Sequence, residues 1–299
     1  MLHIIVAGIL ALPALLVNVI SAIVVGILSI PSLSLLLYKK RSSNADTSNS
    51  FQYKEIPDHV IITGGSSGIG LSIAIQCIKR RDIKRVTILA RNPNKLDTAK
   101  KLLIKTQEEV SSNNSSSNIK TIIQAIPVSV SDCNAIEQVA EDLCKDNIGD
   151  KIILFNCAGI CYTTYMKDIP ATKYYELVQT NQLGAIYTTR AFLPYMTSTT
   201  TGETSKGNNG SGSGTVILTS SVAGQLGVFG YTCYSPTKCA LRGFAETLHM
   251  EIASIDPGYN VQIAFPPDTD TPGDQEELKL MPVETKALSD TTGLANRDE

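Results

Sequence analysis

The chain has 299 residues, of which 43% are apolar and 18% charged, with a formal net charge of -2. This is enough for one large globular domain, or two small ones, with a substantial core. The near-neutral balance provides no electrostatic footprint for nucleic acid, so no nucleic-acid partner is expected. The seven cysteines are scattered without a CxxC pair, so no metal site is expected either.

An N-terminal membrane anchor is predicted over residues 1–38, followed by a polar linker at 39–56. Residues 4–37 contain no charge. This stretch is longer than the roughly 20 apolar residues that a helix needs to cross a bilayer. A secretory signal would begin with a cationic stretch, whereas here the first positive charges follow the apolar run. The positive-inside tendency then predicts that the remainder of the chain stays cytosolic. Pro13 and Pro31 leave a single span and a re-entrant hairpin both open.

Residues 57–299 alternate short apolar runs with helical patterns. Continuous Val/Ile/Leu runs separated by helices predict an α/β fold, a doubly wound parallel sheet of Rossmann-like type with helices on both faces. Two low-complexity stretches, 111–118 and 197–214, are predicted to be flexible surface insertions. The predicted strands are HVIITG, RVTILA, TIIQAIPV, KIILFN, TVILTS and VQIAF, and the first three helices are 68–80, 94–110 and 134–145.

A glycine-rich stretch, ITGGSSGIG (62–70), follows the first strand directly and opens the first helix. Gly64 permits a sharp turn, Gly68 lets the backbone approach a pyrophosphate, and Gly70 lets helix and strand pack closely. The helix N-terminus then offers free amides and a positive dipole end to phosphate. The predicted phosphate-binding positions are Gly64, Ser66, Ser67, Gly68, Ile69 and Gly70.

The same glycines also satisfy GxSxG, the nucleophile elbow of esterases, with Ser66 as nucleophile. That chemistry needs a later histidine as base. Beyond the anchor the chain has only His59, which precedes the serine, and His249, which falls inside a helical pattern. Hydrolase chemistry is therefore poorly supported.

Two cations follow the second strand. Arg91 stands where NAD-preferring sites place a carboxylate for the ribose hydroxyls, and Lys95 comes one helical turn later. A guanidinium can bind phosphate through two hydrogen bonds. The two cations therefore favour a site for the additional 2′-phosphate of NADP over the alternative, a solvated basic loop without a ligand.

The stretch YSPTK places Tyr234 and Lys238 four residues apart, on one face of a helix. A nearby cation favours the phenolate and lowers a tyrosine pKa, which suits proton exchange with a carbonyl oxygen. Pro236 fits a helix only in its first turn, so we expect the helix to begin at Tyr234. A YxxxK pattern alone is common on surfaces, but Ser221, the NCAG stretch (156–159) and Asn181 all fall at or just beyond strand ends, where open α/β sheets bind ligands.

These residues in this order resemble the short-chain dehydrogenase/reductase family, over residues 58–273. The resemblance implies that Tyr234 donates a proton to the substrate carbonyl oxygen, which Ser221 holds; Ser220 lies near the same spacing and stays an alternative. It implies that Lys238 binds the nicotinamide ribose and lowers the Tyr234 pKa, and that Asn181 positions a water.

NADPH is the expected cofactor, with further contacts from Asn156, Ala158, Gly159 and Pro266.

Two departures from the family stand out. The third strand normally ends in an Asp that contacts adenine, whereas this chain has Ser129 there, with Asp132 as a substitute. The family also adds another helix and a seventh strand after Phe265, where this chain has no strand-like run. The last strand is therefore expected to be missing, which would leave an exposed sheet edge.

The stretch FPPDTDTPG (265–273), together with the N-terminal apolar segment, looks like the 3-ketodihydrosphingosine reductases. The resemblance implies reduction of a long-chain sphingoid base at the cytosolic face of the endoplasmic reticulum, by a membrane-bound, dimer-forming enzyme. Asp268 and Asp270 are candidates to pair with the substrate ammonium group, or alternatively cap the backbone of the loop. Two other functions stay open: reduction of another lipophilic carbonyl (steroid, retinoid or fatty acyl), and a catalytically idle nucleotide-binding protein.

Overall fold

The computed structural model describes residues 56–112, 120–146, 150–196, 214–256, 258–267, 269, 271 and 278–292. The predicted anchor and linker lie outside these residues, as do Asp268 and Asp270. Within the described ranges no helix is long and apolar enough to cross a bilayer.

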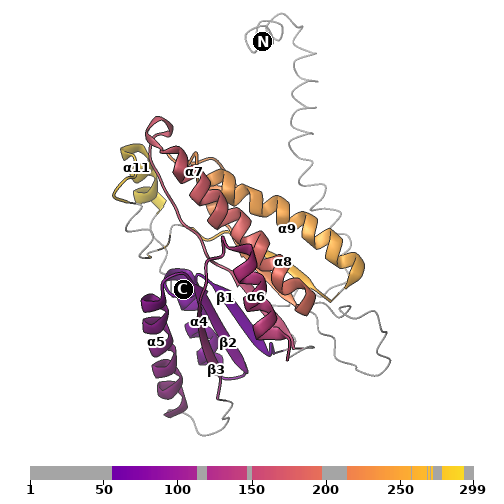
Figure 1. The fold of residues 1–299 in the computed structure, drawn as a ribbon. Helices are drawn as coiled ribbons and strands as arrows, with labels where there is room; N and C mark the ends of the chain where they lie inside the picture. Colours follow the sequence, from indigo (N-terminus) through magenta and orange to yellow (C-terminus); the bar gives the residue numbers. More distant parts are fainter. Residues whose placement is uncertain are drawn as a thin grey trace, which may run out of the picture. The chain divides into compact units, whose positions relative to one another are not determined.

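Six parallel strands form one sheet in the order β3-β2-β1-β4-β5-β6. The order reverses between β1 and β4, as in a doubly wound fold. The sheet predicted from the sequence is thus confirmed (Figure 1). The strands are β1 (His59–Thr63), β2 (Arg85–Ala90), β3 (Ile122–Pro127), β4 (Ile152–Asn156), β5 (Thr215–Thr219) and β6 (Asn260–Ala264).

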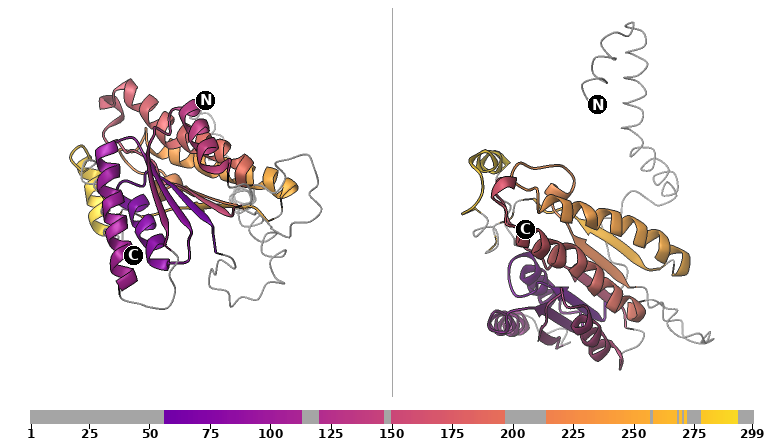
Figure 2. Two further views of the ribbon diagram at one scale, coloured as in Figure 1. Left: turned by 60° about the horizontal axis from the view of Figure 1, so that its bottom comes forward. Right: turned by 45° about the horizontal axis from the view of Figure 1, so that its top comes forward.

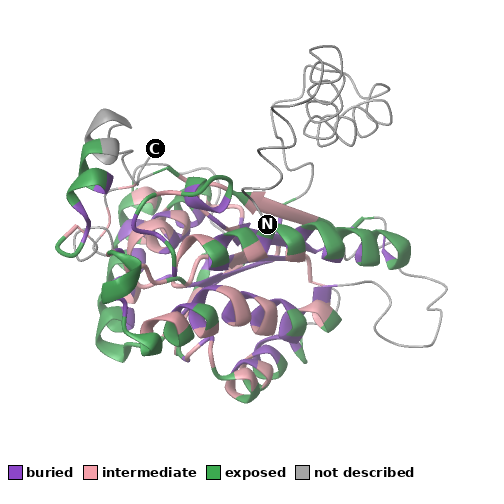
Figure 3. Cartoon of the chain, turned by 90° about the horizontal axis from the view of Figure 1, so that it is seen from above, coloured by how far each residue is buried: buried purple, intermediate pink, exposed green. Residues whose placement is uncertain are grey.

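Helices cover both faces of the sheet (Figures 1 and 2). One face packs under α4 (Gly68–Arg80) and α5 (Pro93–Ser112) through a core cluster that includes Ile62, Ile88 and Leu103. The other face packs under α6 (Cys133–Cys144), α8 (Gly184–Met196) and α9 (Ser235–Ile255) through a cluster that includes Leu154, Phe192 and Leu241. Figure 3 shows the buried strands inside and exposed residues on the outer turns of the helices.

Shorter elements complete the carboxyl edge of the sheet. They are the 3₁₀ turns η1 (Met166–Asp168) and η3 (Val222–Gly224), α7 (Ala171–Leu177), the π-helical η2 (Val178–Leu183) and α11 (Val283–Thr292). Together with α7 and α8, η2 makes one continuous helical run interrupted by a wider π turn.

Two predictions about chain organisation concern residues that the structure describes in part. Of the insertion predicted at 111–118, Ser111 and Ser112 lie in α5, where both serines bond back to helix carbonyls, Ser111 to Gln107 and Ser112 to Glu109. Its other residues lie outside the described ranges. After β6 the described residues contain α11 but no seventh strand. In the described sheet β6 is an edge strand; the absence of a last strand stays a prediction.

Candidate active site

The glycine-rich turn between β1 and α4 is closed by direct backbone contact. Gly64 has a φ of +68°, and a Cβ there would lie 2.9 Å from the backbone of Ala158 at the end of β4. A Cβ on Gly70 would lie 2.6 Å from the carbonyl oxygen of Gly64. Only glycine fits either position, so the start of α4 lies against the turn and faces the ligand side of the sheet.

A cavity of about 510 Å³ opens at the carboxyl ends of the strands, at the point where the strand order reverses. We call it the switch-point cavity. Its lining includes fourteen of the predicted site residues: Gly64, Ser66, Ser67, Gly68, Ile69, Gly70, Arg91, Lys95, Ala158, Gly159, Ser221, Tyr234, Lys238 and Pro266. The topology therefore brings the predicted nucleotide end and the predicted chemical end into one cavity.

Charge in the described lining of this cavity has a single sign. Arg91 and Lys95 stand at one end and Lys238 at the other, and the described lining contains no aspartate or glutamate. Arg91 and Lys95 are exposed, and the side chain of Asn92 accepts a hydrogen bond from the Lys95 amide at 3.0 Å, capping the start of α5. The cavity is thus suited to an anionic ligand that reaches from the exposed cations to the buried lysine.

Tyr234 is the N-cap residue of α9, and Pro236 stands in the first helical turn, as the spacing predicted. Lys238 is 5% exposed, and its Nζ donates to the Thr219 carbonyl at 2.8 Å and lies 5.6 Å from the centre of the Tyr234 ring. Burial lowers the pKa of Lys238 to about 8. This lysine therefore exchanges its proton near neutral pH, beside a phenol that lines the same cavity.

Asn181 stands behind the cavity lining, in the π-helical turn η2. Its Oδ1 accepts from the Ile160 amide and its Nδ2 donates to the Ile160 carbonyl, both at 2.8 Å. The same Nδ2 donates to Thr237 Oγ1 at 3.1 Å, and Thr237 donates to the Tyr234 carbonyl at 2.7 Å. A π turn is a frequent feature of functional sites, because it reorients one side chain and its backbone carbonyl. Here it joins the end of β4 to the first turn of α9.

The structure gives the two neighbouring serines different environments. Ser220 is 2% exposed and its hydroxyl donates to the Lys238 carbonyl at 2.9 Å. Ser221 is half-buried at the N-cap of η3, where its oxygen accepts from the Ala223 amide at 3.1 Å. Because that bond uses the Ser221 oxygen as acceptor, its proton can be donated into the cavity, which favours Ser221 as the oxygen-binding serine.

Besides Asn181, three further predicted residues lie outside the lining. Asn156 is buried at the end of β4 and donates to Thr189 at 3.1 Å, so it ties β4 to α8. Ser129 accepts from the Ser131 amide at 3.3 Å, while its neighbours Val128 and Val130 line the cavity. Asp132, the proposed substitute, is the N-cap of α6 and accepts from the Ala135 amide at 3.0 Å. The adenine contacts of Ser129 and Asp132 stay predictions.

The structure separates the residues of the alternative hydrolase site. Ser66 lines the cavity, whereas His59 is fully buried at the opposite end of β1, where its Nε2 pairs with Thr87 Oγ1 at 2.8 Å. His249 is exposed near the end of α9. Neither histidine is placed to act as a base for Ser66.

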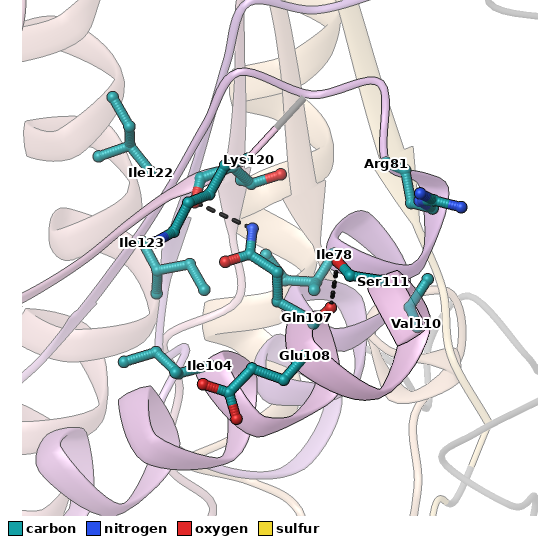
Figure 4. A pocket seen from close by; sticks show the side chains of 11 residues that line it. Ile78, Arg81, Ile104, Gln107, Glu108, Val110, Ser111, Lys120, Ile122 and Ile123 are labelled. Carbon is teal, nitrogen blue, oxygen red and sulfur yellow. Dashed lines mark hydrogen bonds between the residues drawn. The ribbon is translucent and has the colours of Figure 1, made fainter. Parts of the chain in front are cut away.

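Another cavity, of about 640 Å³, lies at the amino ends of the strands, between the ends of α4 and α5 and the start of β3 (Figure 4). Its walls combine isoleucines with Arg81, Lys120 and Gln107. The side chain of Gln107 donates a hydrogen bond to the Thr121 carbonyl. Although this cavity is larger, it contains none of the predicted catalytic residues, and we assign the site to the switch-point cavity.

Three threonines with site contacts are not among the predicted site residues, although Thr63 lies in the glycine-rich motif. Thr63 accepts from the Ala158 amide at 3.1 Å, Thr219 supplies the carbonyl that binds Lys238, and Thr237 bridges Asn181 to Tyr234. Each stands beside a residue that was predicted, but its partner comes from another element. No local pattern marks such contacts.

Comparison with known proteins agrees with this geometry. A family model described as short chain dehydrogenase matches residues 58–280. The 3-ketodihydrosphingosine reductase of Mus musculus is 38% identical over 244 residues, covering 81% of this chain and 65% of the relative. The protein of the same name from Dictyostelium discoideum is 30% identical, covering 85% and 70%. The chain thus spans about two thirds of the length of these relatives.

Solved structures share the fold. An alcohol dehydrogenase from Thermococcus sibiricus, complexed with 5-hydroxy-NADP, superposes with a TM-score of 0.61 at 20% identity, covering 82% of this chain and 86% of that one. The actinorhodin polyketide ketoreductase with NADPH gives 0.62 at 20% identity, covering 81% and 86%. With the family model matching most of the chain and the predicted motif residues gathered at one cavity, this chain belongs to the short chain dehydrogenase family.

Proposed function

We propose that this chain is the catalytic part of an NADPH-dependent reductase that converts the 3-ketone of 3-ketodihydrosphingosine to the hydroxyl of sphinganine. The observation that carries the proposal is the meeting of Ser221, Tyr234 and Lys238 in one cavity whose other end presents Arg91 and Lys95. The names of the relatives, which share 30–38% identity with this chain, support the choice of substrate.

The residues of the switch-point cavity fit a phosphorylated dinucleotide. The contacts at Gly64 and Gly70 leave no room for a side chain, which is the arrangement that brings backbone amides to a pyrophosphate. Arg91 and Lys95 suit an additional phosphate on the adenosine ribose. Bound NADPH supplies the hydride that reduces the ketone carbon.

The protein residues would hold the ketone and deliver the proton. Ser221 donates a hydrogen bond to the ketone oxygen, and Tyr234 transfers its phenolic proton to that oxygen as the carbonyl becomes an alcohol. Lys238, held by the Thr219 carbonyl, stabilises the resulting phenolate and returns a proton through its own ammonium group. The amide of Asn181 fixes the backbone on which these groups stand.

Membrane attachment and assembly belong to the same proposal. The uncharged stretch at 4–37 and the cations that follow it support an anchor with a cytosolic catalytic domain, at the endoplasmic reticulum. A substrate with a long alkyl chain stays in the bilayer, so an anchored enzyme meets it at high effective concentration. We also expect a homodimer, formed through α8 and α9.

The test is NADPH oxidation with 3-ketodihydrosphingosine in mixed micelles, comparing the wild type with Tyr234→Phe. Loss of the phenolic proton should lower kcat by about 10²–10⁴-fold. NADPH binding, followed by its fluorescence, should change less than about twofold, because the hydroxyl is not the anchoring group. Turnover that survives in Tyr234→Phe would exclude this proton donor.

A second candidate substrate comes from another relative. The NADP-dependent 3-hydroxy acid dehydrogenase of Schizosaccharomyces pombe is 30% identical over 207 residues, covering 67% of this chain and 70% of the relative. A substrate panel of the amino-ketone, its des-amino analogue and a short 3-oxo ester separates the two. Preference for the short ester would favour the second candidate.

Selectivity for the amino group is assigned to Asp268 and Asp270 in this proposal, because a carboxylate pairs well with an ammonium group. Replacing each with asparagine should raise KM for the amino-ketone and spare the des-amino analogue. Equal losses on both substrates would instead indicate that these acids cap the loop.

A further inference from the structure

Exposed apolar side chains gather beside the opening of the candidate active site. They come from three segments: η1 and its preceding residue, the loop between η3 and α9, and the residues from Leu280 to Val283, where α11 begins. We call this group the apolar rim, and its members are Tyr165, Met166, Leu226, Phe229, Leu280 and Val283. Met166 is 69% exposed and Val283 72% exposed. Contiguous exposed apolar groups of this size in a folded protein typically mark an interaction surface.

The three segments form one surface, because they contact one another directly. The rings of Tyr165 and Phe229 meet edge-on with centroids 5.9 Å apart, and the Tyr165 hydroxyl donates to Glu284 at 3.0 Å. Thr285 donates to the Phe229 carbonyl at 2.8 Å, and the Thr164 amide donates to the Gly230 carbonyl at 3.2 Å. The rim is therefore a defined, cross-linked surface.

A buried apolar cluster connects the rim to the catalytic tyrosine. Ala223, Tyr231 and Met281 form its centre, with Val228, Leu278, Cys161 and Tyr234 packed against them. The Tyr231 and Tyr234 rings are 5.7 Å apart, and both line the switch-point cavity. An apolar path thus runs from the proposed proton donor to the exposed rim.

Among the described residues of the three rim segments, charge is sparse and nearly balanced. On residues 165–168 and 278–287, Lys167, Lys279 and Lys286 stand against Asp168 and Glu284, and residues 222–234 carry no charge at all. Attraction to an anionic surface would need a stronger basic excess, so burial of apolar area dominates any binding here. This surface fits the headgroup and acyl boundary of a zwitterionic bilayer.

We propose that the apolar rim seats on the membrane leaflet that holds the ketone substrate, so that the alkyl chain of the substrate passes along the buried cluster to Tyr234 without crossing water. This inference rests on the proposed lipid substrate. The uncharged stretch at 4–37 supports a bilayer as the occupant, since it is long enough to hold the chain at one. The linker predicted at 39–56 spans up to roughly 60 Å when extended. A domain of this size has a radius of gyration of about 18 Å, so the tether is long enough for any face of it to reach the same membrane.

The chain has no tryptophan, so a single introduced tryptophan reports its own surroundings. We would place one at Met166 on the rim and, as a matched control, one at Met250, which is 67% exposed on the far part of α9. Both full-length variants go into phosphatidylcholine vesicles with and without brominated acyl chains. Met166→Trp should lose about half or more of its emission to bromine and shift to the blue, as a residue in the acyl boundary does, while Met250→Trp should change little.

Equal quenching of both tryptophans, or no quenching at position 166, would overturn the seating of the rim. Emission of Met166→Trp that follows protein concentration and ignores bromine would assign the rim to a second copy instead, and would equally overturn the proposal. These readouts do not require turnover, so they stand apart from the test of the proposed reaction.

A kinetic arm tests substrate entry. The double variant Met166→Asp, Val283→Asp should raise KM for vesicle-bound 3-ketodihydrosphingosine about tenfold, because charged groups oppose seating in the boundary. KM for a short water-soluble ketone should stay within about twofold, since both residues are exposed and stand outside the cavity lining, where substitutions leave the fold intact. Parallel losses on both ketones would contradict the entry path. Inactivity of the wild type on both ketones would instead reject the proposed reaction.

Discussion

At the residue scale, the predicted catalytic pair includes a lysine whose pKa is lowered by burial. The spacing in YSPTK predicted that Lys238 lies beside Tyr234, but only the structure shows that Lys238 is buried and bonded to the Thr219 carbonyl. Burial is what lowers its pKa to about 8, because a buried ammonium loses hydration. The sequence contains no direct signal for that burial.

We predict that kcat/KM for ketone reduction falls as the pH rises through about 8. Lys238 is charged below its pKa and neutral above it, so the proton supply is complete at low pH and is lost on the alkaline side. The neighbouring Cys157 has its pKa raised to about 11 by burial, and it stays neutral in this window. A profile of kcat/KM against pH from 6 to 10 measures this alkaline limb, the fall in rate above pH 8.

Lys238→Arg provides the control for that profile, since a guanidinium keeps its charge throughout this range. Its alkaline limb should disappear or move above pH 10, at a lower absolute rate. An unchanged limb in Lys238→Arg would assign the titration to another group.

Thr237 illustrates a positioning residue that the motif contains but does not reveal. It accepts from Asn181 and donates to the Tyr234 carbonyl, yet it is 1% exposed and does not line the cavity. Thr237→Val should lower kcat about tenfold, because it removes a hydrogen-bond partner from a buried amide. KM for NADPH should change less than about twofold.

Thr237→Ser should restore kcat, because it keeps the hydroxyl and removes only a methyl group. The shape of the pH–rate profile tells whether Thr237 positions the site or only stabilises the fold. Displacing the first turn of α9 would alter the contact between Lys238 and Tyr234 and so change that shape. A valine variant that loses thermal stability but keeps both kcat and the profile would reduce Thr237 to a structural role.

At the element scale, the helices and strands follow their sequence patterns closely. Alternating apolar runs and amphipathic stretches predicted α4 over the same residues and placed α5 and α6 within two residues of their observed ends. The π turn of η2 was not predicted, because its residues have ordinary helical composition. It depends on the contacts of Asn181 with Ile160 and Thr237, which the chain makes only after folding.

Asp132 allows a test at this scale. Its carboxylate caps α6 by accepting from the Ala135 amide, so Asp132→Ala should lower the free energy of unfolding by about 1 kcal/mol. Asp132→Asn, which still caps, should stay close to the wild type in urea unfolding. KM for NADPH tests the predicted adenine contact: a rise in both variants would support it, and an unchanged KM in both would show that Asp132 only caps α6.

At the scale of the whole molecule, one buried histidine links stability to pH. His59 is 0% exposed in β1, and its Nε2 pairs with Thr87, which donates to Gln124 of β3, so the group crosses three strands. Burial lowers the pKa of His59 to about 3, from an ordinary value of 6.5. Below pH 6.5 His59 is therefore protonated in the unfolded chain but still neutral in the folded chain. Because only the unfolded chain binds this proton, the free energy of unfolding falls as the pH drops toward 3.

We expect His59→Gln to flatten this dependence. Between pH 6 and 4 the free energy of unfolding should fall less steeply than in the wild type, by about 1.4 kcal/mol per pH unit. Urea unfolding in detergent across this range measures both slopes. Equal slopes would show that other groups control acid unfolding.

The sequence by itself determined the strands and helices and the parallel sheet, because local periodicity is a property of neighbouring residues. It also predicted the catalytic set, from the spacing of Tyr234 and Lys238 and the resemblance to the family. Tertiary structure decided what depends on distant segments meeting. It directed the Ser220 hydroxyl to α9 and left Ser221 on the cavity side, buried Lys238 enough to lower its pKa, and recruited Thr237 as a bridge. It also gathered three separate segments into one apolar surface beside the catalytic tyrosine. Such contacts arise from the packing of segments up to about 120 residues apart, which no short stretch of sequence encodes.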